Sequence, residues 1–313
     1  MTKVLVTGGA GFIGSHVVDA LISLGHEAVV IDNLTAGKLE NIHKKAKLYP
    51  IDINDNKLGE IFTKEKPDYV IHLAAQTQVT KSITNPRFDA EVNINGTISL
   101  LQQCALHRTK KLIYSSSGAV YGHSQRLPIK EEEMTRPVSF YGLSKYAAEQ
   151  YIQLFGVLYE LDYTILRYSN VYGLRQNPHG ESGVLAIYIN NLLKNRDLIV
   201  HGDGEQTRDF IFVKDVARAN LQALHYGSRE IINISSNTGT SINQLISKLN
   251  ALIKNKQKII YGEERPGDIK HSRLDNDKAR RLLHWEPAYS LVEGLKETID
   301  YVNSSNLSGS PLA

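Results

Sequence analysis

A glycine-rich turn follows the first apolar segment of the chain. Residues 3–7 form a short apolar run, and glycines then stand at Gly8, Gly11 and Gly14. Apolar residues return after the turn at helical spacing, which predicts a strand, a tight loop and a helix in that order. Glycines let the backbone of such a loop approach a pyrophosphate, which sits on the free N–H groups at the helix N-terminus. The turn therefore predicts a dinucleotide-binding unit.

A carboxylate closes the second predicted strand. Residues 28–31 are apolar and lead into Asp32, close to the offset of about 20 residues at which such units carry a carboxylate. A carboxylate there accepts hydrogen bonds from a ribose and repels a 2′-phosphate, so the predicted cofactor is NAD rather than NADP. The alternative, a glycine-rich turn that binds nothing, does not account for strand, helix and carboxylate together.

Short apolar runs separated by helical patterns continue along the chain. They lie at residues 48–51, 69–73, 111–115 and 163–167. Such runs predict an α/β fold, a Rossmann-type doubly wound parallel sheet with helices on both faces. Ligands of these sheets bind beyond the carboxyl ends of the strands. The loops at residues 73–76 and 115–117 are therefore expected to face a cofactor.

Tyr141 and Lys145 stand four residues apart in a segment with a helical pattern, so their side chains share one face. A free tyrosine has a pKa of about 10. A cation about 4 Å away, at an effective dielectric constant near 20, supplies roughly 4 kcal/mol toward lowering that pKa. The pair therefore predicts a general base. The alternative is an amphipathic helix with an ordinary Tyr and Lys.

Composition excludes several classes of function. The 36 basic and 33 acidic residues are spread along the chain, which argues against a surface for nucleic acid or an anionic membrane. The one cysteine, Cys104, excludes an intramolecular disulfide and is expected to be a small core residue, and the 11 histidines show no metal-type pairing, so no metal is expected. Because we find no targeting pattern and no apolar run of about 18 residues, we expect a cytoplasmic protein.

Eight motifs together point to a family. They are residues 7–14, Asp32-Asn33-Leu34, His72-Leu73-Ala74-Ala75, Asn93-Ile94-Asn95-Gly96-Thr97, Ser115-Ser116-Ser117, Tyr141-x-x-x-Lys145, Arg167-Tyr168-Ser169-Asn170 and Arg265-Pro266-Gly267-Asp268. Their order resembles that of the extended short-chain dehydrogenase/reductases that act on nucleotide sugars, most closely the UDP-hexose 4-epimerases. The match runs from residue 3 to residue 302.

The resemblance implies a larger and a smaller domain. The NAD-binding Rossmann domain would comprise residues 1–169 and 209–236, and a C-terminal α/β domain for the nucleotide sugar would comprise residues 170–208 and 237–302. Residues 303–313 have a composition typical of a disordered tail. The helix predicted at residues 144–158 carries more apolar surface than one sheet face needs, which favours a homodimer, in line with the family, or a helix buried in its own domain.

The resemblance also implies a mechanism of transient oxidation. Tyr141 would remove the proton from the sugar's 4-hydroxyl while hydride passes from carbon 4 to the nicotinamide. The 4-keto sugar would then turn over in the site, and hydride would return to its other face. Lys145 would tune Tyr141 and hold the nicotinamide ribose, and Ser117 would hydrogen-bond the reacting oxygen.

Further residues match the family's binding positions. For the cofactor these are Gly8, Gly11, Phe12, Ile13, Asp32, Asn33, Asp52, Ile53, Leu73, Ala74, Ala75, Asn95, Ser115, Tyr141, Lys145 and Tyr168. For the UDP-sugar they are Ser117, Asn170, Leu185, His201, Arg208, Arg265, Asp268 and Ser272. Two arginines that converge on a diphosphate are physically sensible, because a planar donor fork matches phosphate oxygens; the alternative for each arginine is a surface ion pair.

Two positions depart from the family's pattern. His201 stands where an aromatic residue usually lies on the uracil, and it would do so less securely. Ser272 stands where members restricted to non-acetylated sugars often carry a bulky tyrosine. The smaller serine leaves space, so we expect that UDP-N-acetylglucosamine and UDP-N-acetylgalactosamine fit besides UDP-glucose and UDP-galactose.

Three rival readings stay open. A UDP-glucuronate 4-epimerase would share the same site motifs. A nucleotide-sugar 4,6-dehydratase or decarboxylase needs an additional acid and base, and residues 117–121 carry no carboxylate. A protein that binds NAD without turnover would be expected to lack Tyr141 or Lys145, and both are present.

Overall fold

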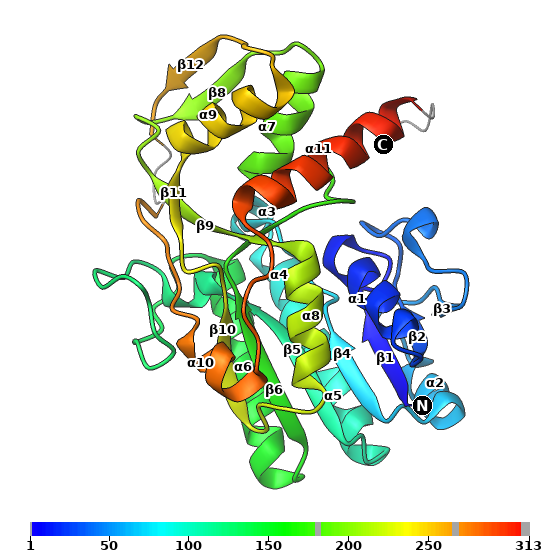
Figure 1. The fold of residues 1–313 in the computed structure, drawn as a ribbon. Coiled ribbons are helices and arrows are strands. Elements are labelled where there is room, and N and C mark those ends of the chain that lie inside the picture. Colours follow the sequence, from blue (N-terminus) through cyan, green and yellow to red (C-terminus); the bar gives the residue numbers. More distant parts are fainter. Residues whose placement is uncertain (1, 179–182, 265–268, 308–313) are drawn as a thin grey trace.

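The computed structural model describes residues 2–178, 183–264 and 269–307. Its larger part is built on a seven-stranded parallel sheet with the strand order β10-β6-β5-β4-β1-β2-β3 (Figure 1). The strands are β1 (Lys3–Thr7), β2 (Glu27–Ile31), β3 (Lys47–Tyr49), β4 (Tyr69–His72), β5 (Lys111–Ser117), β6 (Asp162–Tyr168) and β10 (Glu230–Ile234). The predicted parallel sheet is confirmed.

Helices cover both faces of this sheet. On one face lie α1 (Phe12–Ser23), α8 (Val213–Ala223) and α10 (Asp277–Leu283), and on the other lie α2 (Leu58–Glu65), α5 (Gly96–Leu106) and α6 (Phe140–Leu158). Successive strand residues point to opposite faces, so Val4 and Val6 pack under the first helices and Leu5 under the second. Cys104 is buried in α5, as expected of a small core residue. The sheet is therefore doubly wound.

A second group of elements lies beside the carboxyl ends of the sheet, at the top of Figure 1. It contains a three-stranded sheet, in which β9 (Thr207–Phe212) lies between β7 (Asn170–Tyr172) and β11 (Gly239–Ser241), and a parallel pair of β8 (Leu198–His201) and β12 (Ile259–Gly262). The helices α7 (Val184–Leu193), α9 (Ile242–Ile253) and α11 (Leu291–Leu307) share a core with these strands. The domain boundaries inferred from the sequence stay a prediction.

Short elements complete the described chain. They are the 3-10 turns η1 (Leu39–Asn41) and η3 (Gly118–Tyr121), the helices α3 (Val79–Thr84) and α4 (Pro86–Ala90), and the π-helical turn η2 (Glu91–Asn95). The helices α4 and α5 are thus joined through η2 without a loop between them. The turn η2 brings Asn93 inside, where its side chain bonds other buried groups.

Several predicted bounds differ from the structure. Helix α6 begins at Phe140, ahead of the expected residue 144, because the Ser139 hydroxyl caps it by accepting a hydrogen bond from Gly142 N. Strand β7 follows β6 after one residue and pairs with β9. Helix α11 runs to Leu307, beyond the start of the predicted disordered tail at residue 303. None of the helices in the described ranges is long and apolar enough to span a membrane, and the predicted cytoplasmic location stays a prediction.

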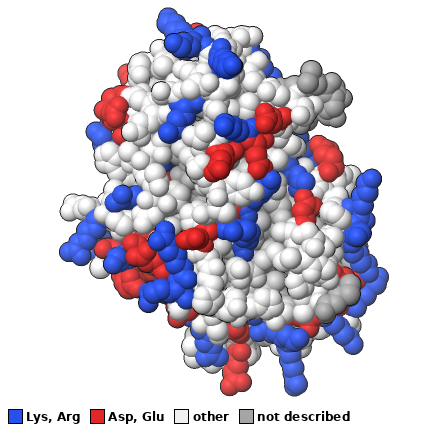
Figure 2. Space-filling model, viewed as in Figure 1, with Lys and Arg blue, Asp and Glu red and all other residues white. Residues whose placement is uncertain are grey.

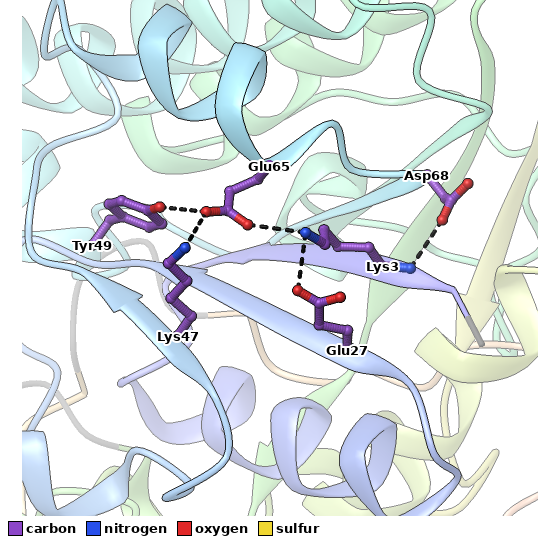
Figure 3. A network of polar contacts seen from close by, with 6 residues as sticks. All are labelled: Lys3, Glu27, Lys47, Tyr49, Glu65 and Asp68. Atoms are coloured by element: carbon purple, nitrogen blue, oxygen red, sulfur yellow. Dashed lines mark hydrogen bonds and ion pairs between the residues drawn. The ribbon is translucent and has the colours of Figure 1, made fainter.

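A buried carboxylate joins strands near the amino ends of β1 and β3 (Figure 3). Glu65, at the end of α2, accepts hydrogen bonds from the ammonium groups of Lys3 and Lys47 and from the Tyr49 hydroxyl. Burial alone would raise the pKa of this carboxyl, but its three donors prevail and lower the pKa to about 2. The network joins the first residues of β1 and β3 to the end of α2, so we expect it to stabilise the fold.

Replacing Glu65 by Gln is expected to lower the free energy of unfolding at pH 7 by roughly 2 to 3 kcal/mol. Because the folded-state pKa lies below the ordinary value of 4.5, this contribution is complete above that pH and is lost as the pH falls toward 2. Urea unfolding at pH 7 and pH 3 should therefore show a smaller difference between wild type and Glu65→Gln at pH 3. The exposed Glu40 is the control, and Glu40→Gln should change little at either pH. An equal difference at both pH values would contradict this role.

Candidate active site

The sheet order reverses between β1 and β4, because the chain runs outward from β1 through β2 and β3 and then returns to start again at β4. A reversal of this kind opens a crevice at the carboxyl ends of the strands, where ligands of such sheets bind. The register pairs Thr7 with His72 and Ser117 with Tyr168. The loops after β1, β4, β5 and β6 therefore meet at one edge, as the sequence indicated.

The glycine-rich turn forms a tight backbone cradle at this edge. Gly8 has a φ of +71°, and a Cβ atom there would lie 2.7 Å from the Ala74 nitrogen. A Cβ atom on Gly14 would lie 2.1 Å from the Gly8 carbonyl oxygen. Helix α1 begins at Phe12, and its N-cap, Gly11, places no side chain over the first turn. Such a helix N-terminus is a fitting place for a pyrophosphate.

Asp32 and Asp52 lie beyond the neighbouring strands β2 and β3. The Asp32 carboxylate accepts hydrogen bonds from Ala10 N at 2.9 Å and from Leu34 N at 2.8 Å, so it also fixes the glycine turn. The Asn33 amide donates to Asp52 at 2.6 Å, and the adjacent Ile53 is buried. These groups lie where the sequence expects the adenosine half of NAD, and a carboxylate beside the turn fits a ribose hydroxyl.

A directed chain of hydrogen bonds joins the glycine turn to the loop after β4. Thr97 donates its single hydroxyl proton to a backbone carbonyl, so its oxygen accepts from His72 Nε2–H at 3.0 Å. His72 Nδ1 then accepts from the Thr7 hydroxyl at 2.7 Å, and Thr7 Oγ1 accepts from Leu73 N and Ala74 N. Burial lowers the pKa of His72 to about 3, so the imidazole is neutral. The loop that carries Leu73, Ala74 and Ala75 is thereby fixed against Gly8.

Tyr141, Lys145 and Ser117 meet beyond β5. The Tyr141 phenol and the Ser117 hydroxyl are hydrogen-bonded to each other. Lys145 is buried in α6, donates to the Ser115 carbonyl at 2.7 Å, and lies 4.8 Å from the centre of the Tyr114 ring. Burial lowers the pKa of Lys145 to about 8, so most of the molecules carry a charged lysine at pH 7.

The pKa of Tyr141 differs from the sequence-based expectation. Burial raises it, and the hydrogen bond with Ser117 lowers it by less. The expected lowering by Lys145 is absent in this structure, because the ammonium is directed at the Ser115 carbonyl and the Tyr114 ring. The geometry therefore supplies a phenol beside a hydroxyl with a cation on the same helix, but not a phenol that is already ionised.

Two buried carboxylates act on Lys145. The charges of Asp89 and Glu149 both raise the pKa of the ammonium, against the larger effect of burial. Glu149 forms a bidentate ion pair with Arg167 and accepts from the Ser116 hydroxyl. The Asp89 carboxylate accepts from the amide of Gln76 at 2.8 Å. Glu149 is thus neutralised by its own partner, whereas Asp89 is held by amide donors.

The sequence analysis named Asn93 within a family motif but gave it no role, and the structure shows that it holds this edge together. Its side chain accepts from Gln76 N at 2.9 Å and donates to Gln76 O at 3.0 Å, so it binds both backbone groups of one loop residue. The same amide donates to the Ser144 hydroxyl on α6. The signal was present, since a polar residue in a buried phase of an apolar helical pattern needs a partner. Asn95, the predicted cofactor contact, is exposed.

The predicted cofactor residues Ser115 and Tyr168 are buried at the ends of β5 and β6. The Tyr168 hydroxyl bonds the Asn220 side chain of α8 and also the Ser115 hydroxyl. In the register of the two strands Tyr168 lies beside Ser117. Their contact with NAD stays a prediction.

Apart from Ser117 on β5, the predicted substrate residues that the structure describes lie on or beside the second group of elements. Asn170 is exposed at the start of β7, Arg208 is half-buried on β9 and donates to Thr207 O at 2.9 Å, and Ser272 is half-buried and donates its N–H to Thr207 O. His201 ends β8, and Leu185 is buried in the core around α7. Arg265 and Asp268 lie outside the described residues. In the described ranges no group of three or more His, Cys, Asp or Glu side chains could hold a metal ion.

The site has the features of a Rossmann enzyme of the short-chain dehydrogenase/reductase type. These are the glycine cradle, the carboxylate after β2, and the helix that carries both Tyr141 and Lys145. The chain belongs to the NAD dependent epimerase/dehydratase family, whose model matches residues 4–235. The family inferred from the motifs is thus confirmed, and so is NAD as the family's cofactor.

Solved structures agree with this assignment. The UDP-glucose 4-epimerase of Thermotoga maritima, solved with UDP-glucose, is 44% identical with a TM-score of 0.95, over 97% of this chain and 99% of that one. The UDP-N-acetylglucosamine 4-epimerase of Methanobrevibacter ruminantium, in complex with UDP-N-acetylmuramic acid, is 37% identical with a TM-score of 0.93 and the same coverage. The UDP-glucose 4-epimerase of Thermus thermophilus, in complex with NAD, is 36% identical with a TM-score of 0.91, again over 97% and 99%. These relatives are isomerases, which is the predicted enzyme class.

Proposed function

We propose that the protein is an NAD-dependent UDP-sugar 4-epimerase. The observation that carries the proposal is the placement of the Tyr141 phenol, bonded to Ser117, at the sheet edge that also holds the glycine cradle. A hydroxyl and a phenol at one point can move a proton at a sugar oxygen. The bound NAD would take hydride from carbon 4 and return it. Because the hydride is returned, neither the sugar nor the cofactor is oxidised overall, and the product is the 4-epimer of the substrate.

The chain's own residues would handle the proton and the charge. Tyr141 would accept the proton of the sugar's 4-hydroxyl and later give it back, with Ser117 as a hydrogen-bonding partner of the same oxygen. Lys145, which is mostly charged at pH 7 because its pKa is about 8, would stabilise a phenolate on the same helix. The proposal therefore requires that Tyr141 ionises in the complex rather than before it.

The substrate would be bound between the two groups of elements. Arg208 and Asn170, with Arg265 and Asp268 from outside the described residues, would hold the diphosphate and uridine. His201 would lie on the uracil, and the residues beyond the sheet edge would hold the sugar. The proposal keeps the domain assignment made above, with residues 1–169 and 209–236 for NAD and residues 170–208 and 237–302 for the nucleotide sugar.

The sugar itself is tested by incubating the purified protein, without added cofactor, with UDP-glucose, UDP-N-acetylglucosamine and UDP-glucuronate separately. Chromatography of the products should show a 4-epimer, and the fastest substrate names the enzyme. Release of water or carbon dioxide would instead favour a dehydratase or decarboxylase. No reaction even with added NAD would favour a protein that binds NAD without turnover.

Replacing Ser272 by Tyr is expected to discriminate between acetylated and plain sugars. Ser272 is half-buried on a segment that pairs with β9 next to Arg208, so a phenol ring there would fill space that an N-acetyl group needs. Turnover of UDP-N-acetylglucosamine should fall at least about tenfold relative to UDP-glucose, since a steric mismatch of this kind costs roughly 1 to 3 kcal/mol. Equal or better turnover of UDP-glucose by the wild type, with no change in Ser272→Tyr, would count against the role of Ser272.

A homodimer is proposed from an exposed apolar stripe on α6. Tyr151, Leu154 and Leu158 are 40%, 51% and 63% exposed, and their spacing puts them on one face of the helix. Leu143, nearer the start of the helix, lies on the same face and is 50% exposed. A stripe of this kind fits a second copy of the same helix. Light scattering should give twice the chain mass of 35.0 kDa, and a single-chain mass at micromolar concentration would refute the dimer.

A further inference from the structure

Asp209 is a fully buried carboxylate that neither the sequence motifs nor the proposed chemistry uses. It lies on β9, one residue after Arg208, and none of its surface is exposed. Because side chains alternate along a strand, Arg208 and Asp209 point to opposite faces of β9. Burial raises the pKa of Asp209 to about 6, against the hydrogen bonds that lower it. A buried carboxylate is costly, so its partners indicate what it is for.

All of its partners are donors, and they come from three separate segments. Oδ1 accepts from the Ser236 hydroxyl at 2.7 Å, from Ser236 N at 2.9 Å and from the Ser169 hydroxyl at 3.4 Å. Oδ2 accepts from Leu274 N at 3.2 Å. Ser169 follows β6 and Ser236 follows β10, so the carboxylate anchors β9 to the carboxyl ends of two strands of the main sheet. Leu274 belongs to the segment of residues 269–276, which carries Ser272.

This segment has further backbone contacts around Ser272. Thr207 N donates to Lys270 O at 2.9 Å, and Ser272 N donates to Thr207 O at 3.2 Å. The Ser235 hydroxyl donates to Leu274 O at 2.9 Å. Both backbone polar groups of Leu274 are therefore hydrogen-bonded, the N–H group to Asp209 and the carbonyl group to Ser235.

We propose that Asp209 is a positioning residue for the nucleotide sugar. Its carboxylate sets the segment 269–276 and the loop that leads to Asn170 at fixed places beside Arg208. This inference rests on the proposed function for the identity of the substrate. It adds that one buried carboxylate, which touches no substrate itself, holds the segment 269–276 and the loop before Asn170 in place beside Arg208.

An amide in place of the carboxylate weakens one contact selectively. Asn has one acceptor oxygen and one donor nitrogen, and every partner of Asp209 is a donor. The oxygen is expected to keep the Oδ1 position, where three hydrogen bonds are made, so the amide nitrogen faces Leu274 N–H. Asp209→Asn therefore releases the segment 269–276 while it keeps the anchors to Ser169 and Ser236.

Asp215 offers a matched control. It is also fully buried, its two oxygens accept from the backbone N–H groups of Ala288 and Tyr289, and Oδ1 forms an ion pair with Arg218 at 3.1 Å. These partners lie outside the segment 269–276 and outside the predicted substrate residues. Asp215→Asn therefore makes the same chemical change to a buried carboxylate without touching the proposed anchor.

The test compares wild type, Asp209→Asn and Asp215→Asn, with NAD content measured for each. In Asp209→Asn we expect KM for the UDP-sugar and Kd for UDP, by calorimetry, to rise at least about tenfold, the size expected for a hydrogen bond to a buried charge. We expect kcat within about threefold and an unchanged NAD content. Asp215→Asn should leave KM and Kd within about twofold, whatever its thermal stability.

Each outcome decides one claim. Equal UDP affinities in the two variants, or a fall in kcat at constant KM in Asp209→Asn, would overturn the positioning role. A wild type that binds UDP but epimerises no sugar removes the proposed function, while the UDP affinities still decide the role of Asp209; a wild type that does not bind UDP removes both. If Asp209→Asn does not fold, Ser235→Ala replaces it, because it releases Leu274 O, and unchanged UDP affinity there would overturn the inference.

Discussion

Tyr141→Phe is expected to lower kcat for epimerisation by at least about 1,000-fold, within the range that positioned proton transfer contributes. The change removes one oxygen, the one bonded to Ser117, and leaves the ring in place on α6. Because this oxygen is the only group that the account assigns to the sugar proton, little activity should remain. NAD content and UDP affinity should stay near those of the wild type, and both are measured on the same preparations.

Tyr146→Phe is the matched control for that change. Tyr146 lies on the same helix and is half-buried against a separate cluster that contains Val120 and Leu274. Loss of its hydroxyl should leave kcat within about threefold, because the ring keeps its packing and the hydroxyl is assigned no contact with the sugar or the cofactor. If Tyr141→Phe kept more than a tenth of the wild-type kcat, Tyr141 would not be the base.

Gly8→Ala is expected to abolish NAD retention and with it the activity. The φ of +71° already costs an L-residue roughly 1 to 2 kcal/mol. In addition, the new Cβ would lie within 2.9 Å of the Ala74 and Leu73 backbone atoms, which the Thr7 hydroxyl holds in place. The loop after β4 must then move away from the glycine turn, and the cradle opens. Purified Gly8→Ala should carry less than about a hundredth of the NAD per chain found in the wild type.

Gly25→Ala separates strain from crowding. Gly25 has a φ of +80°, and a Cβ atom there would meet no other atom within 4 Å. The variant therefore has the same backbone penalty without the clash, and should lose roughly 1 kcal/mol of stability while it keeps its NAD. Equal loss of NAD in both variants would mean that general destabilisation, rather than the cradle at Gly8, governs cofactor binding.

Elements with strong periodicity could be predicted from sequence. The bounds expected for β1 agree with Lys3–Thr7, because an uninterrupted apolar pattern fixes both the element and its ends. The sheet edge that gathers Gly8, Asp32 and Ser117 followed from their places after the carboxyl ends of predicted parallel strands. The family's motifs then supplied roles for the residues of this edge.

Tertiary contacts account for what sequence reasoning did not find. The start of α6 depends on the Ser139 cap, a local signal that the sequence reasoning overlooked. The π-helical turn accompanies the burial of Asn93, whose partner Ser144 lies far along the chain. The raised pKa of Tyr141 results from burial, which a spacing rule does not report. Asp209 has partners far away in sequence, at Ser169 and Leu274, so no local pattern marks it.

Charge distribution agrees with a small-molecule site. Basic and acidic side chains are interspersed over the face of the molecule that Figure 2 shows. The described cations that matter to the proposal, Lys145 and Arg208, lie on α6 and β9 beside the sheet edge. Recognition of a diphosphate needs only a few such groups that converge, so the near-neutral composition and the proposed substrate are compatible.

The most direct test of the central claim follows the hydrogen on carbon 4. The fastest of the three UDP-sugars is prepared with deuterium at that carbon and incubated with the purified protein in ordinary water, without added NAD. Transient oxidation with return of the same hydride predicts that the 4-epimer keeps its deuterium at carbon 4. Loss of the label to water, or an inverted product that formed without the bound cofactor, would contradict the account.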